Sequence, residues 1–271
     1  MMELLFFRFA LAAYLLSTAG YIASLFAGRV RVARVSTWVL ALAFVLHTVH
    51  IAIQWIGGAS VPSANIYTSL SFIAWAVAGL YLIFQARTKT RVLGAFVSPV
   101  VVVMVVAASA GMTGEGPFPS ALRGPLVSIH IVLLLIGGAL FVLACLAGIM
   151  YLMQDRLIRE KRVRGFSRLL PSLQDLDRIN HLCTIWGFPL LTFGIIAGSV
   201  WARTVWGSDW HWDPKQVFTA VAWFLYAVVV HQRIAIGWKG RKAALLSIIA
   251  FAGLVFAFVG VNAFFVTMHR F

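Results

Sequence analysis

Long apolar runs alternate with short polar breaks along the whole chain. Each run reaches roughly the length of 20 residues with which a helix crosses the hydrocarbon layer of a bilayer. The runs cover residues 4–27, 36–56, 66–86, 92–112, 125–153, 181–202, 216–238 and 243–266. The pattern therefore predicts an all-α fold, a polytopic integral-membrane bundle of about eight transmembrane helices.

The composition agrees with a membrane protein and excludes an ordinary soluble domain. Of the 271 residues, 62% are hydrophobic and only 11% are charged, with a mean hydropathy of +0.94. Soluble chains carry about 25% charged residues. The formal net charge of +14 does not indicate nucleic-acid binding, because the basic residues lie in short clusters between the apolar runs. Such clusters are typical of cytoplasmic loops in proteins of the lipid bilayer.

The positions of these basic clusters predict the orientation of the chain. They follow the first, third, fifth and seventh runs and consist of Arg29, Arg31 and Arg34; Arg87, Lys89 and Arg91; Arg156, Arg159, Lys161, Arg162, Arg164, Arg168 and Arg178; and Lys239, Arg241 and Lys242. All of them lie on one side of the bilayer if every run crosses it, so both termini are predicted on the outer, periplasmic side. The longest basic loop, 154–180, is predicted to contain a short interfacial helix.

Nothing in the sequence indicates a second domain. Residues 1–271 show no fixed-period repeat and no low-complexity tract, so they are predicted to form a single integral-membrane domain. The first run is too long for a signal peptide and lacks a basic n-region, so we expect it to stay as the first span. Cys145 and Cys183 stand apart in apolar surroundings, which excludes a CxxC motif and predicts two small buried side chains.

Two histidines are predicted to meet a tryptophan-rich loop at the outer face. His130 lies near the start of the fifth run, His269 follows the eighth, and the loop WGSDWHWDPKQ at 206–216 connects the sixth and seventh. Either histidine alone would be explained by an interfacial position. Because neutral imidazoles from two helices can grip a flat metal macrocycle from both sides, the combination favours a ligand site.

The other histidines have different predicted roles. His231 lies roughly 22 Å below the loop along a helix, where it is either a structural helix-end residue or part of an inner ligand site. His47 and His50 share one face of the second run and are expected to hydrogen-bond between helices, with a ligand or proton-relay role as the alternative. His181 is predicted to be interfacial, and a direct ligand contact of His211 is the less favoured alternative.

The loop itself combines indoles with acids at fixed positions. Trp206, Trp210 and Trp212 are explained either by an aromatic belt at the membrane interface or by a platform of flat faces for a flat ligand. Trp206 and Trp210 are one turn apart if that part is helical. Asp213 followed by Pro214 is typical of a cap that begins the seventh helix.

The loop resembles the WWD signature of the membrane heme-handling proteins of cytochrome c assembly, of the CcsA/ResC type and related to CcmC. The similarity continues through GFPLLTFGIIAGSVWARTVWGSDWHWDPKQ at 187–216, YAVVVHQRIAIGWKGRKAA at 226–244, GVN at 260–262 and His269. Upstream, VPSANIYTSLSFIAW at 61–75, LGAFVSPVV at 93–101 and the helix with His130 are similar to the N-terminal half of that family. The resemblance covers nearly the whole chain.

This resemblance implies a role in cytochrome c biogenesis by the System II route, with heme b as the bound group. It implies that His130 and His269 ligate the heme iron at an outer site, against the WWD segment with Trp206, Trp210, Trp212 and Asp213. It matches His231 to an inner heme site whose second ligand comes from a ResB/CcsB-type membrane partner. Arg203 is our first choice for binding the propionates, ahead of Arg123 and Lys215, although a solvated cation at the interface is the favoured explanation for each of the three taken singly. No side chain is assigned a catalytic role.

The implied activity is that of the heme-presenting subunit of a cytochrome c synthase, or heme lyase, in the bacterial inner membrane. Heme is conveyed outward and presented to the CxxCH motif of apocytochrome c, whose thiols a thioredoxin-like protein keeps reduced. Two departures from the family pattern stand out: Gln216 replaces a usual Glu, and Arg270 and Phe271 follow His269 in place of Ser-Tyr. The alternatives are CcmC-like delivery to a heme carrier, a b-type electron-transfer subunit and a regulatory relative without heme handling.

Overall fold

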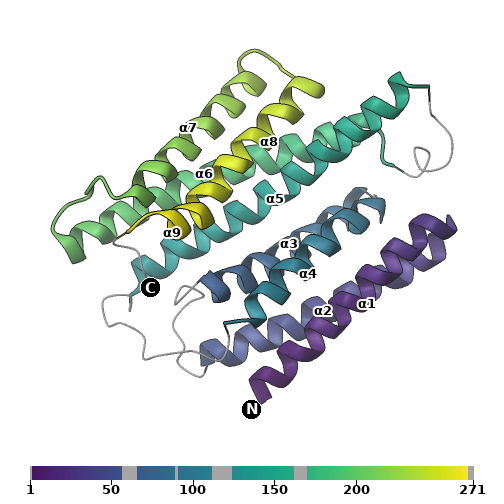
Figure 1. The fold of residues 1–271 in the computed structure, drawn as a ribbon, viewed down its shortest axis with the longest axis horizontal. Coiled ribbons are helices and arrows are strands. Elements are labelled where there is room, and N and C mark those ends of the chain that lie inside the picture. Colours follow the sequence, from purple (N-terminus) through teal and green to yellow (C-terminus); the bar gives the residue numbers. More distant parts are fainter. Residues whose placement is uncertain (1, 57–65, 89–90, 112–123, 162–169, 268–271) are drawn as a thin grey trace. The chain divides into compact units, whose positions relative to one another are not determined.

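The computed structural model describes residues 2–56, 66–88, 91–111, 124–161 and 170–267, and this part of the chain is helical without a β-strand. The all-α prediction is therefore confirmed. In chain order the elements (Figure 1) are α1 (Met2–Ala27), α2 (Val30–Ile56), α3 (Ile66–Thr88), a 3-10 turn (Arg91–Leu93), α4 (Gly94–Ser109), α5 (Pro125–Arg159), α6 (Leu173–Trp206), α7 (Pro214–Ile234), α8 (Arg241–Val255), a π-helical turn η4 (Phe256–Gly260) and α9 (Val261–Phe264).

Seven of the eight predicted spans correspond to one helix each, and the eighth corresponds to α8, η4 and α9 in succession. Among the described residues, seven helical segments are long and apolar enough to cross a membrane, the last being the continuous stretch Arg241–Phe264. The helix of the fourth run, α4, has only 16 residues and is shorter than the predicted 92–112. The chain is thus a multi-pass membrane protein with one short apolar helix among its spans.

The helix ends differ most from the prediction around residues 154–180. α5 continues to Arg159 and α6 already begins at Leu173, so the described parts of this segment extend the two spans and form no separate interfacial helix; residues 162–169 lie outside the described residues. The polar stretches 154–159 and 173–180, by which the two helices are extended, contain no Gly or Pro that would stop a helix. His181 consequently lies two turns inside α6 and not at its start.

The chain divides into two compact units, the first formed by residues 1–118 and 156–172 and the second by 119–155 and 173–271. In the first unit, Gly28 with φ +61° makes the tight reversal between α1 and α2. Buried polar groups hold these helices together. His47 is fully buried and places Nε2 2.9 Å from Ser71 Oγ and Nδ1 3.4 Å from Tyr14 OH. The predicted hydrogen-bonding role of His47 is confirmed.

His50 makes a comparable contact at the N-terminal end of α1. Its Nδ1 lies 3.1 Å from the carbonyl oxygen of Glu3, and its ring contacts Phe7 with centroids 5.1 Å apart. The contact ties the C-terminal end of α2 to the first turn of α1. Both histidines that share a face of α2 therefore link helices within this unit.

Aromatic stacking organises the core of the second unit. Phe141 of α5 stacks on Tyr226 of α7 with ring centroids 3.6 Å apart, and Leu191, Val229 and Ala250 complete the buried cluster. Gly187 of α6 lies against the Phe141 ring, where a Cβ would collide with it. The cluster brings α5, α6, α7 and α8 together.

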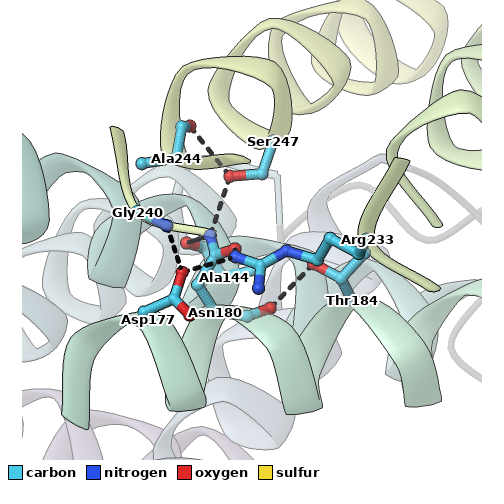
Figure 2. A network of polar contacts seen from close by, with 8 residues as sticks. All are labelled: Ala144, Asp177, Asn180, Thr184, Arg233, Gly240, Ala244 and Ser247. Atoms are coloured by element: carbon cyan, nitrogen blue, oxygen red, sulfur yellow. Dashed lines mark hydrogen bonds and ion pairs between the residues drawn. The ribbon is translucent and has the colours of Figure 1, made fainter. Parts of the chain in front are cut away.

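A buried polar network fastens the same helices at one end of the unit (Figure 2). Arg233 of α7 forms an ion pair with Asp177 of α6 at 3.1 Å, and its side chain is only 2% exposed. Arg233 also donates to Asn180, whose amide donates to Ser247 of α8 and to the Ala144 carbonyl of α5. Asp177 accepts a further hydrogen bond from the backbone N–H of Gly240 at 2.9 Å. Arg233 and Asn180 thus connect four helices at the end of the unit opposite to the tryptophan loop.

Candidate functional site

The tryptophan loop is a compact connection between α6 and α7. α6 ends at Trp206, and Gly207 follows in the left-handed region with φ +79°, which is a common way to end a helix. Residues 207–213 are not helical, so Trp206 and Trp210 are not stacked one turn apart. Asp213 caps α7 by accepting from the Lys215 backbone N–H at 3.1 Å, with Pro214 in the first position. The predicted cap is confirmed.

The three indoles separate into two groups. Trp206 contacts Trp201 and His211 edge to face, with centroids 5.3 and 5.7 Å apart. Trp210 and Trp212 contact each other at 5.6 Å and are 39% and 78% exposed. Trp212 also has φ +54°, a conformation that costs a non-glycine residue about 1–3 kcal/mol. The loop therefore holds the exposed indole of Trp212 in a strained backbone conformation.

Gln216 closes the loop onto the first turn of α7. Its Oε1 accepts a hydrogen bond from the backbone N–H of His211 at 2.9 Å. A glutamate at this position would accept the same bond, so the departure from the family pattern keeps the acceptor and removes only the charge. Across the loop, Arg203 pairs with Asp209 at 3.2 Å, and both side chains are largely exposed.

His130 is held on α5 by the backbone of α6. Its Nδ1 lies 2.6 Å from the carbonyl oxygen of Gly194, and a carbonyl can only accept, so Nδ1 carries the proton. The neutral ring then has its lone pair on Nε2, the arrangement found in metal-bound histidines. Gly198, one turn further along α6, leaves room for the ring, because a Cβ there would collide with Cε1 and Nδ1. The site therefore presents Nε2 as an electron-pair donor.

His269, the predicted second ligand, lies outside the described residues, as does Arg123. The chain leading towards His269 packs beside the loop end of α7. Phe265 contacts Phe218 with centroids 5.6 Å apart, and Asn262 of α9 accepts from Lys215 Nζ at 3.4 Å. The loop, the start of α7 and the C-terminal segment thus lie together.

His231 lies in the last turn of α7 and is exposed. The buried face of this helix carries Tyr226, Val229 and Arg233. Two residues correspond to about 200° of rotation on a helix, so His231 faces away from the helices that Arg233 fastens. The structure thus separates this histidine from the loop by almost the full length of α7.

Two glycines and an asparagine contact the site residues, although the sequence analysis assigned them no role. Gly194 and Gly198 orient His130, and Asn262 contacts Lys215. The GIIAG spacing in α6 was the available signal, since small residues four apart let helices approach closely. In the described residues, no three His, Cys, Asp or Glu side chains gather to hold a metal ion.

These features define the class of the protein: a multi-pass helical membrane protein with an oriented histidine beside a tryptophan-rich loop. A family model described as Cytochrome C assembly protein matches residues 63–269, and the chain belongs to this family.

Relatives and a solved structure are similar over most of the chain. The cytochrome c biogenesis protein CcsA of Pyropia yezoensis is 28% identical, with 84% of each chain covered. CcsA of Gloeobacter violaceus is 27% identical and covers 97% of this chain and 94% of its own. CcsA of Trieres chinensis is 30% identical over 77% of each chain.

The solved structure of cytochrome c heme lyase CcmF has a TM-score of 0.64 at 16% identity. The match covers 97% of this chain but 51% of that one, so the chain spans about half the length of CcmF. The similarity shows a shared fold.

Proposed function

We propose that the protein presents heme for covalent attachment in cytochrome c biogenesis. Its membership of the cytochrome c assembly family and its similarity to CcsA proteins support this role. The observation that carries the proposal is the hydrogen bond from His130 Nδ1 to the Gly194 carbonyl, which leaves the lone pair on Nε2 as the ring's donor for iron. Heme b is the form of heme proposed here, because its vinyl groups are still free to react.

The residues near His130 have two proposed roles, since some contact heme and others hold the conformation of the tryptophan loop. Trp210 and Trp212 offer exposed indole faces on which a porphyrin can lie. Asp213 is buried and occupied by the α7 cap, so its part is to set the loop and not to touch heme. His269 is the proposed second axial ligand. The gain is positional, since the porphyrin would be held in one orientation.

The chemistry that this arrangement serves is thioether formation. Each of two thiols in the CxxCH motif of apocytochrome c adds across one vinyl group, with sulfur bonded to one carbon and hydrogen to the other. No net oxidation or reduction accompanies the addition. A thioredoxin-like protein is the proposed source of reduced thiols, and the bacterial inner membrane, with the loop on its outer side, is the proposed location. The protein acts here as the heme-presenting subunit of a cytochrome c synthase.

His231 is the proposed inner heme ligand. Because it faces away from the helix bundle of its own unit, a second ligand for the same iron would come from a chain packed against α7. A ResB/CcsB-type membrane protein is the proposed partner. Heme would be taken up there before it reaches His130.

A b-type electron-transfer subunit is less well supported. Such a protein needs paired histidines whose nitrogens are free for iron. Both ring nitrogens of His47 are occupied by Tyr14 and Ser71. CcmC-like delivery to a carrier shares the outer site and differs in its acceptor, so the two functions are separated by supplying either a carrier or an apocytochrome c peptide.

The test is a visible spectrum of the purified full-length protein with and without a ResB-like partner. In the protein purified without the partner, whose inner site lacks its second ligand, we expect a low-spin bis-histidine heme signal that is lost when His130 and His269 are both replaced by glycine. His181→Gly is the matched control, because this histidine lies in the N-terminal half of α6, whereas Gly194, which contacts His130, lies in the C-terminal half. A signal that survives the double replacement would overturn the outer-site proposal.

A further inference from the structure

Lys215 is an incompletely satisfied cation at the first turn of α7. We propose that Lys215, supported by Asn262, binds a carboxylate of the tetrapyrrole, that is, a propionate of heme held at His130. The inference rests on the proposed function and deepens it. It also replaces Arg203, the first choice from the sequence, by a different cation.

The contacts of the Lys215 ammonium leave it short of partners. Nζ donates one long hydrogen bond of 3.4 Å to Asn262 Oδ1, whereas an ammonium has three donors. Among the described residues, no carboxylate lies within 4.0 Å of this nitrogen. The Asp213 carboxylate attracts the ammonium electrostatically without an ion-pair contact, and its Oδ2 accepts from the backbone N–H of residue 215. The ammonium therefore has room for at least one anionic ligand.

The environment of Lys215 makes such a partner valuable. The residue is half-buried, and a charge removed from water is costly unless it is paired and hydrogen-bonded. A carboxylate would supply a charge-assisted hydrogen bond that Asn262, a neutral acceptor, cannot. The geometry thus indicates that the Lys215 ammonium can bind an anionic ligand.

The position of Lys215 connects this cation to the proposed iron ligand. The ammonium is close enough to the His130 ring for the two groups to interact electrostatically, although they come from different helices. It also contacts α9, which carries the chain towards His269. A porphyrin bound through its iron to His130 would bring its propionates, at the edge of the macrocycle, within the neighbourhood of this cation.

Arg203 is neither partly buried nor short of an anionic partner. Its side chain is 70% exposed and already paired with Asp209 at 3.2 Å. A ligand carboxylate would have to displace Asp209 and would gain little from a solvated cation. This contrast makes Arg203 the matched control for Lys215.

The experiment compares heme with heme dimethyl ester, in which both propionates are neutral. The full-length protein is titrated with each compound in lipid nanodiscs and the low-spin absorption is followed. We expect wild type to prefer heme by about 10- to 100-fold, the range of a hydrogen bond to a charged group. Lys215→Met should abolish this preference by weakening heme binding alone, whereas Lys215→Arg and Arg203→Met should keep it.

Unchanged binding of the ester by Lys215→Met shows that the site is still folded. The inference is overturned if Lys215→Met keeps the preference, if it weakens both compounds equally, or if Arg203→Met is the variant that loses it. The proposed function is tested separately by His130→Gly. If heme binding depends on His130 while the preference survives in Lys215→Met, only the propionate assignment fails; if heme binding does not depend on His130, the outer site itself fails.

Discussion

The imidazole of His130 and the backbone of Gly194 are joined by a hydrogen bond of 2.6 Å that connects α5 to α6. The bond fixes which ring nitrogen carries the proton. It also makes the orientation of the ring depend on a neighbouring helix, so substitutions on α6 are expected to change the chemistry of a residue on α5.

Gly198→Ala tests this dependence. A Cβ at this position collides with the His130 ring, which must move and lose its bond to Gly194. We expect the affinity for heme at the outer site, measured by titration of the low-spin absorption, to fall by about 10-fold or more, since second-shell changes commonly cost 10- to 100-fold in metal affinity. The helix itself should not be weakened, because alanine is the better helix former by about 1 kcal/mol.

The control for this variant is Gly138→Ala on α5, where an added Cβ meets nothing within 4 Å. Both variants are compared by visible spectroscopy and thermal unfolding. An unchanged heme spectrum in Gly198→Ala would show that the glycine does not position the ring.

Arg233→Met is predicted to destabilise the second unit strongly. The substitution leaves Asp177 without its cation, and breaking a buried ion pair in this way costs about 3–5 kcal/mol. Arg156→Met is the matched control, because the Arg156–Glu160 pair at 2.7 Å is exposed on the arginine side and should contribute little to stability. Equal unfolding free energies for the two variants in a denaturant titration would contradict the structural role of Arg233.

His231→Gly is predicted to abolish cytochrome c assembly and to recover it with added imidazole. The side chain is exposed and lies outside the packed face of α7, so its loss should leave the fold intact and a site open to a small ligand. Heme staining of cytochrome c in a strain that depends on this protein measures the recovery. His181→Gly should assemble cytochrome c without imidazole, and a failure of imidazole to rescue His231→Gly would remove the ligand assignment.

Gln216→Glu is predicted to retain function, whereas Gln216→Leu is predicted to reduce it. Glutamate preserves the acceptor for the His211 backbone N–H, and leucine leaves this donor without its partner at a cost of about 1–3 kcal/mol. The loop would then lose its attachment to the first turn of α7. Heme-stained cytochrome c is again the measurement, and normal levels in Gln216→Leu would show that the bond is dispensable.

The features that the sequence predicted well are local ones. The helices follow from long apolar runs, and the α7 cap follows from the adjacent residues Asp213 and Pro214. The extent of α5 and α6 beyond their apolar parts was missed, since a polar segment without Gly or Pro can remain helical outside the hydrocarbon layer.

The details of the site depend on contacts between distant residues. His130 meets Gly194 across 64 positions, and Lys215 meets Asn262 across 47. Hydropathy and spacing do not specify which helix faces which, so the ring orientation and the choice between Arg203 and Lys215 needed the three-dimensional arrangement. The strained φ of Trp212 likewise has no signature in the residue type, because tryptophan does not favour that conformation.

The ion pair between Arg233 and Asp177 has a mechanical consequence for α7. The ion pair restricts the rotation of α7 about its own axis. A rotation that turned His231 inward would break the buried contact between the Arg233 guanidinium and Asp177. The C-terminal end of α7 is thus held against α6, while its N-terminal end directly follows the tryptophan loop. A displacement of α7 would therefore have to carry along the helices that hold its arginine.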